Sequence, residues 1–294
     1  MIHYWPLNSE GNTSVKQGST TSTNTKKKTA PTTTKKDQYA AIKSKGKTVA
    51  GGVTGLVERL PCGDVVKSPW PGDEREAECR RDMAIEAQIY QRLGPHPRLV
   101  KVIDWDPETC VLTMEYMPNG SLKDFLHAHN DDISMPQRLQ WIRQAAEGLQ
   151  LLHSAGVIHC DIGPRNFLLD AALDLKIADF SGSSLDGSSA SVCAGTRFSL
   201  PDFSWNDPPT VRQDLFGLGS TIYCIMTRTG QCPFGDLPSN QVEKLYAASE
   251  FPDVSEIVIG MPRVGEIIKR CWRCEVGSAK EVYDYIQQVL ESNK

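Results

Sequence analysis

Two carboxylates and one amide flank a pair of short apolar stretches in the middle of this chain. Asp161 is followed five residues later by Asn166, and Asp179 comes just after the second of the stretches 167–169 and 175–177, which read as a strand pair. One carboxylate can orient an attacking hydroxyl and accept its proton. An amide oxygen and a second carboxylate are ligands that Mg²⁺ prefers. The spacing therefore predicts phosphoryl transfer from a magnesium nucleotide.

Charge divides the chain into two unequal parts. Residues 1–47 hold nine Lys against Glu10 and Asp37, a net of +7, which leaves −11 for residues 48–294 because the whole chain carries −4. Ser and Thr make up half of residues 11–34, and apolar side chains are almost absent there. Such a segment cannot offset its ordering entropy, so we expect disorder to about residue 38. We predict a basic tail over 1–47 and one folded domain over 48–294.

The remaining composition predicts a soluble, intracellular monomer. No apolar run approaches the ~18 residues that a bilayer span requires, and the first ten residues lack the pattern of a secretory signal. Nine cysteines without a paired framework suit a reducing compartment, and Cys271 and Cys274 are expected to be ordinary side chains at a helix end. We expect a cytoplasmic protein, or a nuclear one if its Lys clusters serve in import, with no membrane partner. Short Lys runs are more often solvated than bound to nucleic acid, so no nucleic-acid partner is expected.

A glycine-containing hairpin opens the folded part. Residues 50–57 read as a strand, a glycine loop and a second strand, and a turn leads to a third strand that carries Lys67. Gly52 and Gly55 would let backbone amides approach phosphates where a Cβ would intrude, and Val57 would then cap an adenine ring. A glycine-rich turn in a hairpin is also common without any ligand.

Helical periodicity follows in two places. Residues 74–93 carry apolar side chains at helical spacing, and Glu86 falls on their inward side, where a carboxylate needs a partner. A strand over 111–117 then passes into a turn, and a buried helix is predicted over 135–155.

These stretches together resemble the eukaryotic protein kinase superfamily, and most closely its divergent fungal-type members. The resemblance rests on His159-Cys160-Asp161, Asn166 and Asp179-Phe180, and it extends to the helix that begins near Asp214, whose carboxylate would bond the backbone of the catalytic loop. It implies an α+β, bilobal fold. A small β-rich lobe with one key helix would span about 48–116, and a larger helical lobe about 117–294, with ATP and Mg²⁺ between them.

The same resemblance implies a role for each site residue. Asp161 would be the base and Arg165 a cation beside the transferred phosphoryl group, and Lys67 would hold the α and β phosphates while paired to Glu86. The implied metal ligands are Asn166 and Asp179. The implied nucleotide-contacting residues are Gly52, Gly55, Val57, Lys67, Met114 as gatekeeper, and the backbone from Glu115 to Met117.

Four positions depart from the kinase pattern. Gly163 stands where Ser/Thr kinases have Lys, and Ala50 and Ser181 stand where glycines are usual. Cys160 replaces the Arg that, in many kinases, binds a phosphate on the activation segment. We therefore expect activity without phosphorylation of that segment, whose candidate acceptors are Ser188, Ser189, Ser191 and Thr196.

Three functions are compatible with the sequence. The first is an ATP-dependent protein kinase that acts on a protein substrate, at Ser or Thr rather than Tyr. The second is a small-molecule phosphotransferase of the same fold, and the third is a nucleotide-binding pseudokinase or scaffold. We favour the first because none of the base, metal or lysine positions is lost.

Overall fold

The computed structural model describes residues 45–70, 72, 74–227 and 230–292. Residues 43–294 group into one compact unit. Almost all of the predicted tail lies outside the described residues, so its disorder stays a prediction. The first strand begins at Lys47, the last residue that we assigned to that tail.

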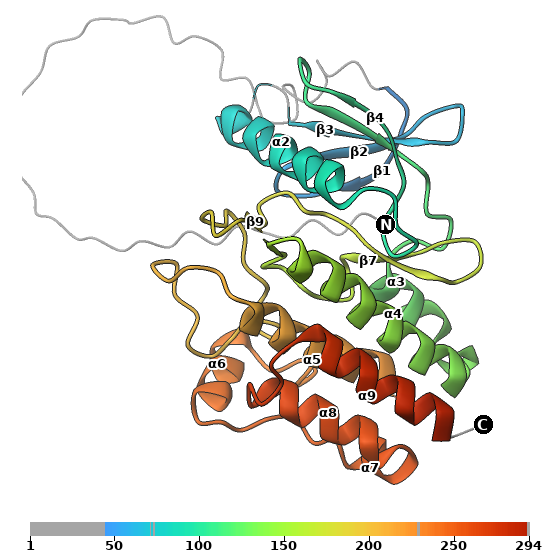
Figure 1. Cartoon of the computed structure of the whole chain (residues 1–294), viewed down its shortest axis with the longest axis vertical. Coiled ribbons are helices and arrows are strands. Elements are labelled where there is room, and N and C mark those ends of the chain that lie inside the picture. The colour runs from blue at the N-terminus through green and yellow to red at the C-terminus, as the bar shows by residue number, and fades with distance from the viewer. Residues whose placement is uncertain (1–44, 71, 73, 228–229, 293–294) are drawn as a thin grey trace, which may run out of the picture. The chain divides into compact units, whose positions relative to one another are not determined.

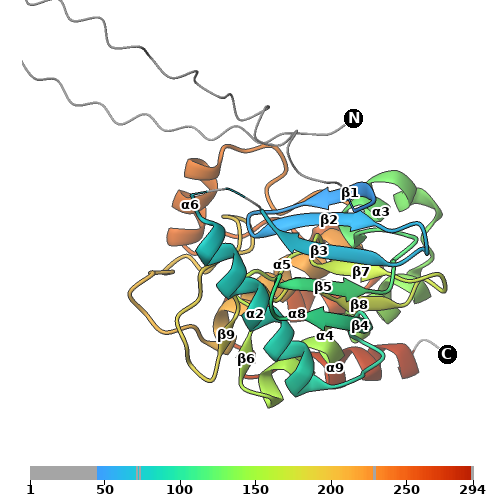
Figure 2. The ribbon, with the colours of Figure 1, turned by 90° about the horizontal axis from the view of Figure 1, so that it is seen from above.

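One antiparallel sheet forms the N-terminal part of this unit. Its strands are β1 (Lys47–Gly51), β2 (Gly55–Arg59), β3 (Val65–Pro69), β4 (Val102–Asp106) and β5 (Val111–Met114). They lie in the order β1-β2-β3-β5-β4, as the view from above shows (Figure 2). Val57 pairs with Lys67, so the glycine-containing turn of 52–54 joins β1 to the strand beside the lysine. The predicted arrangement of three strands is confirmed.

A single long helix, α2 (Glu76–Leu93), packs beside this sheet. Its buried face carries Met83, Glu86 and Ile89, each three residues after the last, and Tyr90 beside them. Two acidic residues in its first turn and an arginine in its last turn complement the helix dipole. The helix predicted over 74–93 is confirmed, with its start two residues later.

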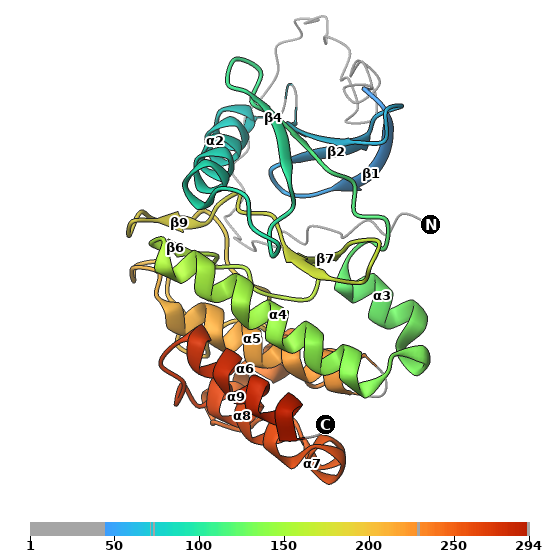
Figure 3. The ribbon, with the colours of Figure 1, turned by 45° about the vertical axis from the view of Figure 1, so that its right-hand side comes forward.

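The C-terminal part is helical. Its helices are α3 (Leu122–His129), the 3₁₀ turn η1 (Asn130–Asp132), α4 (Met135–Ser154), α5 (Val211–Met226), α6 (Ser239–Ala247), α7 (Ser255–Gly260), α8 (Pro262–Trp272) and α9 (Ala279–Ser292). Helix α4 packs on α9, and α5 packs on α8, which gives the layers visible in Figure 3. Fully buried Trp141 and Trp272 lie in this core. The bilobal α+β architecture predicted from the sequence is confirmed.

Two small strand pairs lie between the sheet and the helices (Figure 1). They are β6 (Val157–Ile158) with β9 (Ser184–Leu185), and β7 (Phe167–Leu169) with β8 (Leu175–Ile177). Their loops carry the two carboxylates and the amide with which the sequence argument began. Among the described residues, each helix is too short or too polar to cross a bilayer.

Candidate active site

Lys67 and Glu86 form a buried ion pair between β3 and α2. The Lys67 Nζ atom lies 2.6 Å from Oε2 of Glu86 and 2.6 Å from Oδ1 of Asp179. The side chains of Lys67 and Glu86 are 7% and 1% exposed, so each charge depends on its partner. Burial alone would lower the pKa of Lys67, but the two carboxylates outweigh it and hold that pKa above its ordinary value. For Glu86, burial raises the pKa against the opposing effect of Lys67.

Asp179 follows β8 and faces the same lysine. Its backbone has φ 65°, in the left-handed region, and its carboxylate contacts Lys67 on β3. Burial would raise the pKa of Asp179, but the Lys67 ammonium and the Ser181 hydroxyl lower it to about 2. Both Lys67 and Ser181 bond Oδ1, each at 2.6 Å. The side chain is 46% exposed, and Oδ2 is left for another ligand.

An aromatic stack fixes the segment that carries Asp179. Phe180 is fully buried, and its ring lies 4.8 Å from that of Tyr90 on α2 and 5.7 Å from that of His159. The Phe180 N–H also donates to Oε1 of Glu86 at 3.3 Å. These contacts place the phenyl ring under α2, and the preceding carboxylate is thereby directed to Lys67.

Asp161 lies in the loop between β6 and β7, where two neighbours orient it. The Asn166 amide donates to the Asp161 carbonyl at 2.6 Å and to its Oδ2 at 3.0 Å, and Arg165 pairs with Oδ1. Because the Asn166 Nδ2 atom makes both bonds, its Oδ1 remains available to a cation. The N–H of Ala178 donates to the Asn166 carbonyl at 2.9 Å, which ties this loop to the residue before Asp179.

The carboxylate of Asp214, on α5, hydrogen-bonds the backbone of this loop. It accepts hydrogen bonds from the backbone N–H groups of His159 at 2.8 Å and Cys160 at 2.9 Å. Its Oδ2 also lies 2.9 Å from Nε2 of His153. Cys160 has φ 67°, a strained conformation for a non-glycine residue, and the Asp214 bond stabilises it. The role that the resemblance implied for Asp214 is confirmed.

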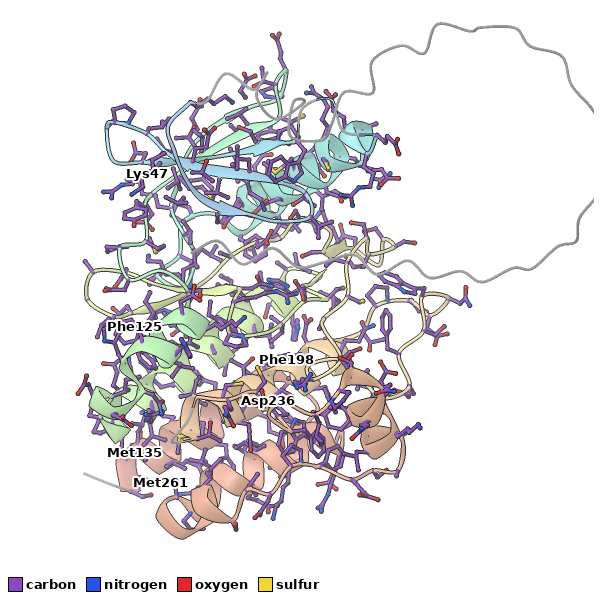
Figure 4. The ribbon with its side chains drawn as sticks, turned by 180° about the vertical axis from the view of Figure 1, so that it is seen from behind. Lys47, Phe125, Met135, Phe198, Asp236 and Met261 are labelled. Atoms are coloured by element: carbon purple, nitrogen blue, oxygen red, sulfur yellow. The ribbon has the colours of Figure 1, made fainter. Side chains whose placement is uncertain are left out.

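Gly163 lies beneath the ring of Phe198. A Cβ at this position would lie 3.6 Å from the ring, at van der Waals contact. Phe198 lies in the C-terminal lobe near the loop that carries Asp236 (Figure 4). Gly163 carries no side chain toward Asp161, and the cation that pairs with Asp161 is Arg165, four residues along the loop, as we expected.

The two glycines predicted to contact phosphate, Gly52 and Gly55, lie in different surroundings. At Gly55 a Cβ would lie 2.2 Å from the Ser68 carbonyl oxygen, so glycine is required there for strand pairing. Gly52 meets open space instead, and its carbonyl accepts from Nε1 of Trp70 at 2.9 Å. The side chain of Thr54 bonds the hydroxyl of Ser181 at 2.9 Å.

The predicted adenine-contacting residues from 114 to 117 lie where β5 leaves the sheet, whereas Val57 lies on β2. Met114 and Met117 are buried in the core, and half-buried Val57 packs against the same core. The Glu115 side chain accepts from the Lys101 N–H at 2.8 Å. The backbone from 115 to 117 thus connects the two lobes, at the position predicted for it.

A small cavity of about 220 Å³ adjoins Cys160. The residues that line it include Ser189, Trp205 and Asp207, and none of them is Lys or Arg. Burial raises the pKa of the Cys160 thiol to about 12, so this side chain stays neutral. A phosphate here would find no cation among the described lining residues.

Two site residues were missed or only partly understood from the sequence. Ser181 was identified as a departure from glycine, but its hydroxyl lies within bonding distance of Lys67, Asp179 and Thr54. The sequence feature that could have indicated these contacts is a polar residue directly after Asp179-Phe180. Thr54 gave no signal, because its contact depends on how the glycine loop folds onto the segment after β8.

The chain is similar to known kinases over most of its length. A family model for the protein kinase domain matches residues 65–294. Among curated proteins, the chain is 28% identical over 239 residues to the serine/threonine/tyrosine-protein kinase HT1 of Arabidopsis thaliana, covering 77% of this chain and 58% of HT1. It is 28% identical over 244 residues to the probable serine/threonine-protein kinase PBL28 of the same plant, covering 73% and 64%. It is 27% identical over 241 residues to the probable serine/threonine-protein kinase drkC of Dictyostelium discoideum, covering 75% and 32%. The chain thus spans less than two thirds of each relative.

Proposed function

Because this chain belongs to the protein kinase family, we propose that it transfers the γ-phosphate of ATP to a hydroxyl of a protein substrate, at serine or threonine rather than tyrosine. The family generally uses ATP and Mg²⁺. The observation that carries the proposal is the contact of one buried ammonium, Lys67, with both Glu86 and Asp179 at 2.6 Å. A lysine fixed in this way presents a cation where phosphates would bind.

The donor set fits a magnesium ion. Oδ2 of Asp179 and Oδ1 of Asn166 are hard oxygen ligands, and the hydrogen bonds of each side chain leave that oxygen available. When bound, Mg²⁺ would neutralise charge on the β and γ phosphates. We propose these two residues as its protein ligands.

Asp161 is the proposed base. Its carboxylate is held by Asn166 and Arg165 from two sides, so its orientation is set before a substrate arrives. It would accept a hydrogen bond from the substrate hydroxyl and take the proton as the phosphoryl group transfers. Arg165 supplies positive charge at the same place, which offsets the absence of a lysine at Gly163.

The nucleotide is proposed to bind between the two lobes. Val57 and Met114 would contact the adenine ring, and the backbone of Glu115 and Met117 would bond its edge. Gly52 faces open space, so a phosphate could approach its backbone. Gly55 serves the pairing of β2 with β3 and is proposed to line the phosphates from the end of the same loop.

The pseudokinase alternative draws on Ala50, Gly163 and Ser181. Arg165 lies beside Asp161 although Gly163 carries no side chain, and the hydroxyl of Ser181 joins the lysine and the carboxylate rather than displacing either. Arg165 thus supplies a cation in place of the lysine that is missing at Gly163, and Ser181 adds a hydroxyl to the site. These observations support an active enzyme over a scaffold.

The test is phosphate transfer from ATP to matched peptides that differ only in the acceptor. Peptides carrying Ser, Thr or Tyr in one sequence context are incubated with the full chain, with Mg²⁺ or with EDTA. We expect Mg²⁺-dependent transfer to Ser and Thr. Nucleotide binding without transfer to any acceptor would favour the pseudokinase, and transfer to Tyr alone would overturn the proposed specificity.

A further inference from the structure

The hydroxyl of Ser181 joins three parts of the site. Its Oγ atom lies 2.6 Å from Oδ1 of Asp179, 3.1 Å from Nζ of Lys67 and 2.9 Å from Oγ1 of Thr54. These partners come from the segment after β8, from β3 and from the glycine loop. The residue is only 6% exposed, so water competes little for these bonds.

The protons of this cluster can be assigned. A serine hydroxyl has one proton to donate and two lone pairs that accept. Its proton goes to the Asp179 carboxylate, which is only an acceptor, and the Lys67 ammonium is only a donor. Thr54 must therefore donate to Ser181. All the hydrogen-bonding capacity of the hydroxyl is used.

The backbone accepts a side chain at Ser181 without strain. The left-handed conformation falls on the next residue, Gly182, which has φ 88°. A Cβ on Gly182 would lie 2.8 Å from Oγ of Ser191 and 2.9 Å from Cγ1 of Val192, so glycine is needed there. The conformational requirement lies one residue later, and position 181 is free to carry a functional group.

Ser181 and Lys67 together set which oxygen of Asp179 is available. Oδ1 accepts from both Lys67 and Ser181, so the carboxylate cannot rotate without breaking two hydrogen bonds. Oδ2 then remains for a cation. Mutation of a hydrogen-bond partner that orients a metal-binding carboxylate typically lowers metal affinity or activity about 10- to 100-fold.

We propose that Ser181 is a positioning residue that orients Asp179 for Mg²⁺ and ties the glycine loop to the same carboxylate through Thr54. This inference rests on the proposed use of magnesium nucleotide. It adds a residue that acts through Asp179 and does not itself touch the transferred phosphate. Because Lys67 keeps Glu86 and Asp179 as partners, loss of the hydroxyl should weaken the site for Mg²⁺ much more than for the nucleotide alone.

The experiment measures ATP binding to the full chain by calorimetry over a range of Mg²⁺ concentrations and in EDTA. For Ser181→Ala we expect the half-saturating Mg²⁺ concentration to rise about tenfold or more, with ATP affinity in EDTA changed less than about threefold. Ser181→Thr keeps the hydroxyl and should restore the Mg²⁺ dependence. Ser184→Ala is the matched control, because the buried Ser184 hydroxyl has no hydrogen-bond partner among the described residues.

A second readout separates the two arms of the cluster. Thr54→Val removes only the hydrogen bond between the glycine loop and Ser181, and Ser181→Ala removes that bond too. Deuterium exchange over residues 51–55 should therefore increase in both variants. Only Ser181→Ala should shift the Mg²⁺ dependence, and an equal shift in Thr54→Val would contradict the assignment to Asp179.

The failure of this inference is distinct from failure of the proposed function. If the wild type binds ATP equally in Mg²⁺ and in EDTA, the proposed magnesium chemistry is wrong. If the wild type requires Mg²⁺ and Ser181→Ala requires the same concentration, the positioning role is overturned. Ser181→Ala could weaken Mg²⁺ binding simply by destabilising the fold, and its unfolding temperature would show this. In that case Ser181→Thr decides: if this variant is as stable as the wild type but still binds Mg²⁺ weakly, the positioning role of Ser181 is overturned.

Discussion

Ser191 donates a hydrogen bond of 3.0 Å to Oδ2 of Asp82, a buried carboxylate on α2. The other oxygen of Asp82 lies 3.7 Å from Nε of the exposed Arg81 and has no hydrogen-bond partner among the described residues. A serine in the activation segment therefore contacts an acidic group, where kinases regulated by phosphorylation present a cation. Cys160 lies beside a cavity whose described lining residues include no Lys or Arg. Together with the contact between Ser191 and Asp82, this favours an activation segment whose conformation a phosphate would disturb.

A negative charge at Ser191 should therefore inhibit the enzyme. In Ser191→Glu, a carboxylate is forced against Asp82, and repulsion between like charges displaces the segment from α2. We expect transfer activity to fall at least about tenfold, a change of ~1.4 kcal/mol. Initial rates of the unphosphorylated protein and the variant measure this.

Two further variants locate that effect. Ser189→Glu adds the same charge at an exposed neighbour and should change activity less. Adding Asp82→Asn to Ser191→Glu should recover part of the loss. If the unphosphorylated wild type is inactive and Ser191→Glu is active, the activation segment does need a negative charge, and the prediction is contradicted.

Removing the ammonium of Lys67 should destabilise the fold as well as abolish transfer. Lys67→Met leaves Glu86 and Asp179 without their shared cation, and breaking a buried ion pair in this way costs about 3–5 kcal/mol. Burial raises the pKa of Glu86, so Glu86 is more readily protonated at pH 5 than at pH 7. Because protonation removes one unpaired charge, the loss of stability in Lys67→Met should be smaller at pH 5.

Urea unfolding at the two pH values, with Lys101→Met as an exposed control, measures this loss. Equal losses in the two variants would mean that the buried pair contributes nothing to stability.

Asp179 should give stability a specific dependence on acid. Its folded pKa of about 2 lies below the ~3.9 of an unfolded aspartate, so its ion pair stabilises the fold above the unfolded value and that stability is lost as pH falls toward 2. The difference in unfolding temperature between wild type and Asp179→Asn should be constant above pH ~5 and should close between pH ~4 and ~2.

Thermal unfolding across this range tests the dependence on acid. Asp104→Asn, on the exposed part of β4, controls for the loss of one carboxylate. A difference between wild type and Asp179→Asn that widens as the pH falls would contradict the sign of the shift.

Gly182 should tolerate a side chain less well than Gly187. Both have positive φ, 88° and 80°, but a Cβ on Gly182 would meet Ser191 and Val192 whereas one on Gly187 meets nothing within 4 Å. Gly182→Ala should therefore lose stability by about 1–3 kcal/mol, and more than Gly187→Ala, which carries the backbone cost alone. Chemical denaturation of the pair measures the difference, and equal losses would argue against the steric contact.

Much of the site could be predicted because its residues follow local patterns. The spacing from Asp161 through Asn166 to Asp179 marks a loop, a hairpin and a strand end, and helical periodicity placed Glu86 on the buried face of α2. These signals lie within short segments, and tertiary packing preserved them.

The remaining features depend on contacts between distant segments. A Cβ at Gly55 would clash with the Ser68 carbonyl on the next strand, a constraint that the sequence pattern does not reveal. The bond between Thr54 and Ser181 joins residues 127 positions apart. The left-handed backbone at Gly182, with Ser191 and Val192 packed against it, likewise depends on how the activation segment folds, and a sequence pattern alone does not contain it.

The most direct test of the central claim compares the wild type with Asp161→Asn in Mg²⁺-dependent phosphate transfer and ATP binding. Asparagine keeps the shape of the side chain but removes the base, so we expect ATP binding to persist while transfer falls about 10²- to 10⁴-fold. Equal transfer by the two proteins, or none by either despite intact ATP binding, would contradict the assignment of Asp161 as the base of an active protein kinase.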